Sequence, residues 1–246
     1  MTAVFLENLT WTEAEKCFQS DAIFVIPLGA ALKEHGLHLP LNNDKLIAVR
    51  LTEEIGKRLD IIVLPVCETS YYPAFTEYPG SISFSFETSC ALIGETCAGL
   101  ASFGCRKIYV LNTGFSTLKV LAKVQESLSA EHPQLKFAYT DFQKALETAS
   151  HGLCEQEGGG HADEVETSVM LALAPQIVSM ENARADFHGD QSGPLTRSKE
   201  RANEPNSNLV FSPSGAWGDP TLATKAKGEA IVEALLDWIE KDLRGF

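Results

Sequence analysis

Three short apolar runs, separated by segments with helical periodicity, constrain this chain more than any other feature. The runs AIFVIPLGA (22–30), IIVLPV (61–66) and KIYVLN (107–112) are rich in β-branched residues. Such runs are typical of strands that are buried on both faces of a parallel sheet. The segments 44–59 and 87–104 between them repeat apolar residues at helical spacing. This alternation predicts an α/β fold, a three-layer α/β/α sandwich with a mainly parallel central sheet.

The remaining segments continue the same pattern. The alternation of SISFSF (81–86) predicts a strand with one buried face, and LKFAYTDF (135–142) predicts another strand. Helices are predicted over 117–133, 163–178 and 222–243. The chain of 246 residues contains no internal repeat and no clear linker, so we expect a single domain over its whole length.

Charge and composition exclude several classes of function. The net charge of −13 disfavours binding to nucleic acid, because an acidic surface repels phosphates. No apolar run approaches the ~20 residues of a membrane span, and the N-terminus does not resemble a signal peptide. The six cysteines form no C-x-x-C pair, and we expect them to be reduced thiols. We therefore expect a cytoplasmic protein that binds neither membranes nor nucleic acid.

The motif KEHGLHLPLNND (33–44) follows the first apolar run and is the strongest candidate for a functional site. It places Glu34, His35, His38 and Asp44 within twelve positions, at the end where parallel sheets bind ligands. Imidazole and carboxylate groups together are ligands for Zn²⁺ or Mn²⁺. Each residue also has an ordinary interpretation, since Asp44 could simply cap a helix. The combination favours a metal site.

This motif resembles the signature of the creatininase (creatinine amidohydrolase) family. Members read E-Q-H-G-x-H-L-P, with an Asp nine residues after the first His. Further stretches resemble family motifs in the same order: YPGSIS, HADEVETSVMLALAPQIV and GAWGDPTLATKAKGEAI. The resemblance extends over nearly the whole chain.

The resemblance implies a creatininase-like fold and a hydrolase that uses one or two divalent ions, Zn²⁺ or Mn²⁺. It implies that His35 is a metal ligand and that Asp44 bridges two metals. It also implies that His161 lies near the substrate and that Glu166 faces the site. Members form homo-oligomers, often hexamers, so the resemblance implies the same assembly here.

One departure from the family lies in the motif itself. The ligand Glu of the family stands two residues before the His, where this chain has Lys33, and Glu34 is adjacent to His35. A bulge would return the Glu34 carboxylate to the metal. Otherwise Lys33 replaces the ligand and weakens one metal site.

A second departure follows the strand 107–112. The family reads N-G-H-G-G-N or similar here, whereas this chain reads NTGFST and lacks the His. Glu166 or His161 could fill the vacancy, or only one metal binds. The hydroxyls and amides of this loop suit a polar substrate, and a helix cap by Ser116 or Thr117 is the other interpretation.

The candidate substrate-binding residues are Asn112, Thr113, Ser116 and, in the GAWGDP stretch, Trp217. The predicted function is metal-dependent hydrolysis of a C–N bond in a small or cyclic, non-peptide amide by metal-activated water. A one-metal lyase or isomerase, or a relative that only binds a ligand, are the alternatives. The missing His makes creatinine an unlikely substrate.

Overall fold

The computed structural model describes residues 3–188, 191 and 193–246. Its centre is a five-stranded sheet in the order β1-β3-β2-β4-β5, in which all neighbouring strands are parallel. In that order the strands are Val4–Phe5, Ile61–Val63, Ile23–Leu28, Lys107–Asn112 and Lys136–Tyr139. The mainly parallel sheet predicted from the apolar runs is confirmed.

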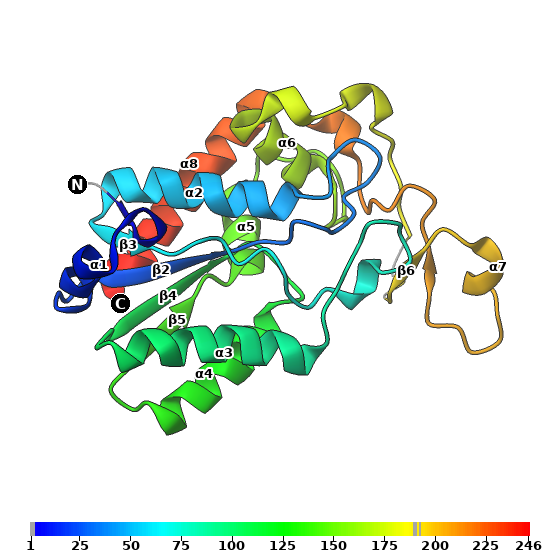
Figure 1. Cartoon of the computed structure of the whole chain (residues 1–246). Coiled ribbons are helices and arrows are strands. Elements are labelled where there is room, and N and C mark those ends of the chain that lie inside the picture. The colour runs from blue at the N-terminus through cyan, green and yellow to red at the C-terminus, as the bar shows by residue number, and fades with distance from the viewer. Residues whose placement is uncertain (1–2, 189–190, 192) are drawn as a thin grey trace.

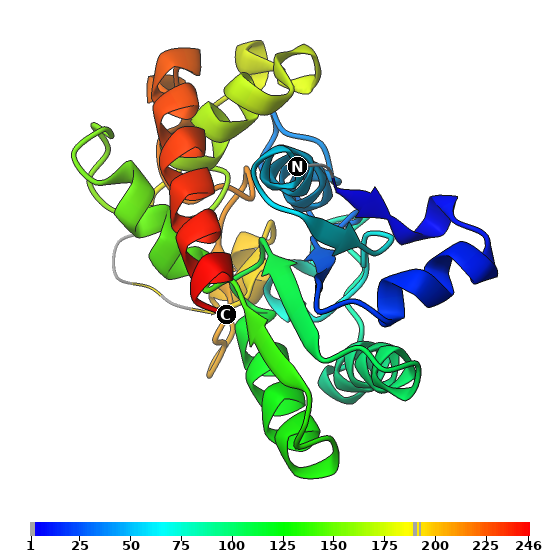
Figure 2. The same cartoon turned by 90° about the vertical axis from the view of Figure 1, so that its left-hand side faces the viewer.

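Helices cover both faces of this sheet (Figures 1 and 2). One face carries α2 (Asn43–Arg58), α5 (Phe142–Ser150), α6 (Glu164–Leu173) and α8 (Lys225–Gly245). The other face carries α3 (Phe86–Ser102) and α4 (Leu118–Glu131). The short helix α1 (Trp11–Phe18) packs near the start of β2, where Phe18 stacks on Phe24. The three-layer α/β/α architecture is therefore confirmed.

The alternation of strand side chains divides the core into two halves. Val25 and Tyr109 point to the layer of α2 and α8, whereas their neighbours Phe24 and Ile108 point to the layer of α3 and α4. All four are buried, because a parallel sheet covered on both faces leaves no side of an inner strand in water. This is why the strand segments of the sequence are almost continuously apolar.

The strand predicted over 81–86 is wrong. Residues 81–85 are irregular, and their amides bond to separate loops: Ile82 N to Leu32 O and Phe84 N to Ser70 O. No single neighbouring strand accepts these bonds, so the alternation does not produce a ladder. Ile82 is also 53% exposed, so the alternation does not mark a buried face either.

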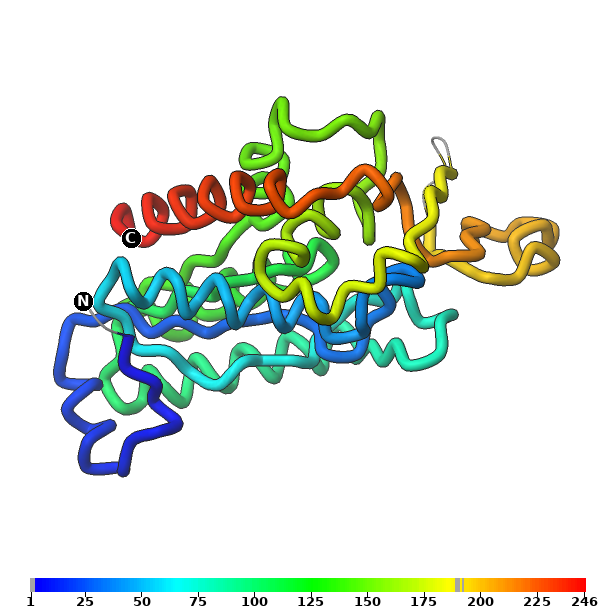
Figure 3. The backbone as a smooth tube through the Cα atoms, turned by 90° about the horizontal axis from the view of Figure 1, so that it is seen from above, coloured from blue at the N-terminus to red at the C-terminus, as the bar shows by residue number. Residues whose placement is uncertain are grey.

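The structure adds elements that the sequence pattern did not predict. A two-stranded parallel sheet of β6 (Leu195–Thr196) and β7 (Val210–Phe211), with α7 (Lys199–Ala202) between them, extends beyond one end of the central sheet (Figure 3). Short 3₁₀ helices complete the fold: Leu6–Asn8, Pro73–Phe75, Pro175–Ile177, Met180–Asn182 and Pro220–Leu222. Among the described helices, none is both long and apolar enough to cross a membrane.

The order of the strands defines where a ligand site is expected. From β2 the chain continues to β3 on one side, whereas β4 lies on the other side of β2. In open α/β sheets the loops at such a reversal separate at the carboxyl ends of the strands and leave a crevice. The loop 29–42 after β2 and the loop 113–117 after β4 flank this point.

Candidate functional site

The loop after β2 turns back onto the start of α2 through a close backbone contact at Gly29. A Cβ atom at Gly29 would lie 2.3 Å from the backbone oxygen of Asp44, so only glycine allows this approach. The contact fixes Asp44 in the first turn of α2, beside the loop that carries His35. Residues nine positions apart in sequence thereby face one another.

His35 and Lys33 share the carboxylate of Asp44. The Nε2 atom of His35 lies 2.7 Å from Oδ1 of Asp44, and Nζ of Lys33 lies 2.7 Å from Oδ2. The Nδ1–H of His35 donates to the carbonyl of Lys33 at 2.9 Å, since a carbonyl can only accept. All three side chains are buried, so this is an ion-pair network shielded from water.

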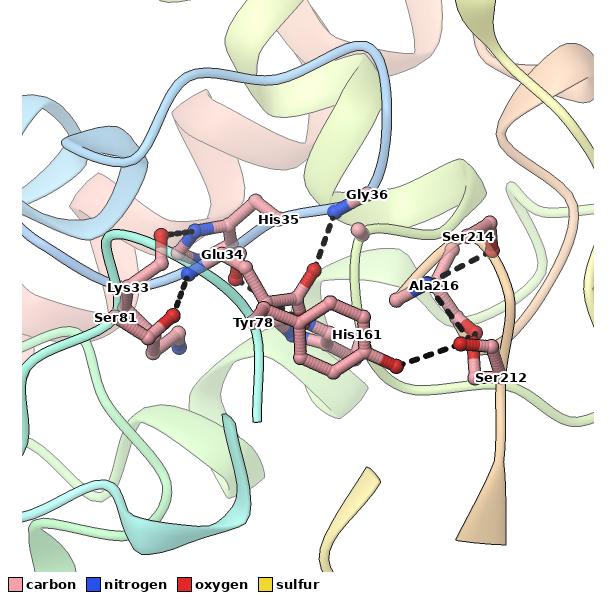
Figure 4. Close-up of polar contacts among 12 residues, drawn as sticks. Lys33, Glu34, His35, Gly36, Tyr78, Ser81, His161, Ser212, Ser214 and Ala216 are labelled. Atoms are coloured by element: carbon pink, nitrogen blue, oxygen red, sulfur yellow. Dashed lines mark hydrogen bonds and ion pairs between the residues drawn. The ribbon is translucent and has the colours of Figure 1, made fainter. Parts of the chain in front are cut away.

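Glu34 contacts a different histidine. Its Oε1 lies 2.7 Å from Nε2 of His161, and its Oε2 accepts from the amide of Gly36 at 2.9 Å (Figure 4). Gly36 has a φ of 69°, which turns the loop so that this amide faces the carboxylate. The loop of Gly215 closes over the same carboxylate, because a Cβ there would lie 2.1 Å from Oε2.

His35, His161 and Glu166 form a buried group whose donor atoms all lie within 4.8 Å of one another. The rings of His35 and His161 have centroids 4.9 Å apart, and Nδ1 of His161 lies 3.7 Å from Oε2 of Glu166. Glu166 lies in the first turn of α6, where the amide of Ala162 donates to its Oε2 at 2.6 Å. Two imidazoles and one carboxylate are a donor set suited to Zn²⁺ or Mn²⁺.

Charge and burial shift the pKa values of this network in definite directions. Burial alone would lower the pKa of Lys33, but Asp44, Glu166 and Glu34 raise it above its ordinary value. Burial alone would raise the pKa of Asp44, but Lys33 and His35 hold it well below its usual range. Lys33 is therefore an ammonium and Asp44 a carboxylate.

The pKa values of neighbouring groups are shifted as well. Burial opposes charge on His161, yet the carboxylates of Glu34 and Glu166 raise its pKa. Burial lowers the pKa of His38 to about 4. Burial, helped by the charge of Glu166, raises the pKa of Asp163 to about 6.

Most polar side chains of the loop after β4 form hydrogen bonds inside the loop or to the adjacent backbone. The side-chain Nδ2 of Asn112 donates to Gly114 O at 2.8 Å, and its Oδ1 accepts from Thr117 Oγ1 at 2.5 Å. Thr113 donates to the carbonyls of Leu28 and Asp44. The side chain of Thr117 does not cap α4. Asn112 and Thr113 thus hold the loop and the start of α2 in place.

Ser116 and Trp217 lie at two different openings. Ser116 lines a narrow cavity together with Lys33 and Asp44. Trp217 lines a separate pocket of about 360 Å³ together with Glu166 and Phe115. Asn112 and Ser116 line the same cavity, and Trp217 lines the neighbouring pocket, with Phe115 shared between the two. The metal and catalytic candidates are joined by direct contacts.

The structure also adds Phe75 and Thr167, two contacts of the site that the sequence analysis did not single out. The ring of Phe75 lies 4.3 Å from the His161 ring and 4.9 Å from Nζ of Lys33, measured to its centroid. Nε2 of His38 lies 2.7 Å from Oγ1 of Thr167 on α6. Phe75 belongs to a Tyr- and Pro-rich loop without a readable pattern, so only its position in space reveals it.

Known proteins are similar to this chain along most of its length. A mycofactocin precursor peptide peptidase of Mycobacterium tuberculosis is 31% identical over 224 residues, which are 87% of this chain and 81% of the relative. A 3-dehydro-scyllo-inosose hydrolase of Thermotoga maritima is 25% identical over 263 residues, covering 99% of this chain and 83% of the relative. Both relatives are hydrolases by name.

Solved structures match the fold over almost the whole chain. A creatininase in a Zn-Zn form has a TM-score of 0.82 at 20% identity and covers 100% of this chain and 98% of its own. A manganese form has a TM-score of 0.81 at 20% identity, covering 99% and 98%. The profile of the Creatininase family, described as creatinine amidohydrolase, matches residues 7–243, so the chain belongs to this family.

Proposed function

We propose that this chain is a metal-dependent amidohydrolase that cleaves a C–N bond in a small or cyclic amide. One observation carries the proposal: two imidazoles and a carboxylate, His35, His161 and Glu166, converge in a buried group at the sheet's crevice. The hydrolase relatives support the reaction class. The relatives include a peptidase, so the restriction to non-peptide amides is part of the proposal.

The tautomer of His35 supports a cation in this group. Because Nδ1–H donates to the carbonyl of Lys33, a neutral ring presents the lone pair of Nε2 to Oδ1 of Asp44. Two acceptors 2.7 Å apart need a proton or a metal ion between them. A backbone carbonyl on the far nitrogen is also the usual support of a metal-bound histidine.

His161 offers a second ligand atom in the same way. Both partners of its Nε2 among the described residues are acceptors, Oε1 and the backbone oxygen of Glu34, so this nitrogen carries the proton. The lone pair of Nδ1 is then directed to the side of Glu166. His35, His161 and Glu166 would hold one ion, and Oδ1 of Asp44 would lie beside it as the neighbouring carboxylate.

A divalent ion bound there would lower the pKa of a water molecule to near 7 and polarise an amide carbonyl. The protein side chains provide the remaining steps. Glu34 orients His161, and Glu166 lines the pocket of Trp217, where an amide could lie. We assign the transfer of a proton from the attacking water to the leaving nitrogen to Glu166, through the carboxylate oxygen that does not hold the ion. His161, whose N–H is bonded to Glu34, would act by holding the ion beside the reacting bond. Trp217 would form an apolar wall for the substrate.

A second candidate function has its own support. The Lys33–Asp44 ion pair and the loop Asn112–Thr117, which contributes no imidazole or carboxylate, favour a one-metal lyase or isomerase, or a relative that binds a ligand without catalysis. The family resemblance also leads us to propose a homo-oligomer, a hexamer by analogy. Sedimentation of the purified protein would measure its mass directly.

The function is tested by loading metal-free protein with Zn²⁺ or Mn²⁺ and assaying amine release from cyclic amides, lactams, formamides and short peptides. We expect turnover of at least one small amide, loss of that turnover in Glu166→Gln, and retention in His132→Ala. His132 lies at the end of α4, away from the group, and controls for loss of an imidazole. If the metal-loaded protein binds one of these compounds but cleaves none of them, the hydrolase proposal is contradicted. That outcome would favour a relative that binds a ligand without catalysis.

A further inference from the structure

The position of Lys33 bears on how many metal ions the site can hold. Lys33 stands two residues before His35, where the family signature has a ligand Glu. It is only 7% exposed, and its ammonium lies 2.7 Å from Oδ2 of Asp44. A positive side chain therefore stands where a negative ligand is expected, and it contacts the carboxylate that would bridge two metals.

Asp44 already divides its two oxygens between two partners. Oδ2 contacts the ammonium of Lys33, and Oδ1 faces Nε2 of His35, which belongs to the candidate metal group. The ring of Phe75 lies 4.9 Å from the ammonium and covers it. The carboxylate thus bridges one fixed protein cation and the place of one metal ion.

The formal charges match a single divalent ion. The carboxylates that contact the two imidazoles are Glu34, Asp44 and Glu166, and Lys33 is the one cation paired with them among the described residues. With neutral imidazoles, two negative charges remain, which one divalent ion neutralises. With Glu at position 33, four negative charges would remain, which two divalent ions neutralise. Buried charges that are not balanced are costly.

The space beside Lys33 is also too small and too poor in ligands for a second ion with its water. The cavity lined by Lys33, Asp44 and Ser116 has a volume of about 10 Å³, the room of roughly one water molecule. Asp44 is the only carboxylate among its described lining residues, and no imidazole lines it. Ser70 and Tyr72 also line it, and their buried hydroxyls, which have no hydrogen-bond partner among the described residues, can bond to a water molecule.

We propose that the Lys33 ammonium is a built-in cation in the place of a second metal ion, so that each chain binds one divalent ion through His35, His161 and Glu166. This inference rests on the proposed function only for the presence of a metal. It does not depend on which amide is cleaved or on whether catalysis occurs.

The test counts metal ions rather than turnover. Metal-free protein is titrated with Mn²⁺ by calorimetry, and the loaded protein is examined by electron paramagnetic resonance. The wild type should bind one equivalent per chain and show the signal of an isolated Mn²⁺. Lys33→Glu should bind a second equivalent and show the signal of two coupled ions, because it adds a ligand and removes the repelling charge.

Two further variants keep the result decisive. Lys45→Glu reverses a lysine whose ion pair with Glu68 lies at the partly exposed surface, and it should keep one equivalent. Lys33→Met should bind at most one equivalent of Mn²⁺ with the affinity of the wild type. This variant also shows whether loss of the ammonium alone disturbs folding. Two tight equivalents in the wild type, or none, would overturn the inference. One equivalent without any amide hydrolysis would instead overturn the proposed function and leave this inference standing.

Discussion

The imidazole of His35 and the carboxylate of Asp44 lie 2.7 Å apart, with Nε2 facing Oδ1 in a buried site. The other ring nitrogen donates to a backbone carbonyl, so the contact requires a cation, either a proton or a metal ion. The second oxygen of Asp44 is held by Lys33. Asp44 is therefore shared between the ammonium of Lys33 and the imidazole of His35.

The Lys33–Asp44 pair should show strong coupling in unfolding experiments without metal. Asp44→Asn leaves a buried ammonium without its carboxylate and should lower the free energy of unfolding by about 3–5 kcal/mol. Lys33→Met leaves the opposite charge and should cost a similar amount. The double variant should cost clearly less than the two single changes together, as measured by urea denaturation. Costs that simply add would show that the two side chains act independently.

Asp44→Asn should also abolish metal uptake. The amide removes the negative charge opposite Nε2 of His35, so the lone pair no longer has a carboxylate to share a cation with. Metal analysis after dialysis should find no bound Zn²⁺ or Mn²⁺ in this variant. Asp21→Asn, at an ion pair on the surface, is the matched control and should bind as the wild type does. An unchanged metal content in Asp44→Asn would refute the role of this carboxylate.

Trp217→Ala should weaken substrate binding more than the chemical step. Trp217 lines the pocket of about 360 Å³ that also contains Glu166, and its indole would contact a bound amide. For the amide turned over fastest in the panel, we expect KM to rise by about tenfold with a smaller change in kcat. Trp217→Phe should recover most of the loss. A fall in kcat at constant KM would place the indole at the reacting bond instead.

His38 should make the protein less stable as the pH falls below 6.5. Burial lowers its pKa to about 4, so the unfolded chain takes up the proton at a higher pH than the folded one. The contribution of neutral His38 to the free energy of unfolding is fully present above pH 6.5. It is lost between pH 6.5 and 4 and amounts to at most about 3 kcal/mol. His38→Gln, which can still bond to Thr167, should show a shallower loss in urea titrations at pH 7, 6 and 5. If the free energy of unfolding depends on pH to the same extent in both proteins, this assignment is contradicted.

Two helical glycines should respond in opposite directions to alanine. A Cβ at Gly228 would lie 1.8 Å from the backbone oxygen of Ser168, so Gly228→Ala should push α8 from α6 and cost about 1–3 kcal/mol or more. A Cβ at Gly94 in α3 would have no atom of the described residues within 4 Å. Gly94→Ala should therefore raise the free energy of unfolding by about 0.5–1 kcal/mol. Thermal unfolding would compare both variants, and equal effects would contradict the packing argument.

The sheet and its helices could be predicted because they depend on local periodicity. The run 22–30 and the helical spacing of 44–59 correspond to β2 and α2, since burial on both faces demands apolar residues throughout. The prediction of a strand over 81–86 failed because it also depended on local periodicity alone. Its alternation resembles a half-buried strand, but the partner of a strand is a tertiary property that no local pattern contains.

The sequence by itself determined the family, the α/β class and the cluster of ligand-type residues between positions 33 and 44, because these are encoded in residue order. Only the tertiary structure decided the pairing of these groups. It joined Glu34 to His161, which is 127 positions away, and placed Lys33 rather than Glu34 on Asp44. The physical reason is that charges in a buried site arrange themselves by distance and balance, and both depend on how remote segments pack.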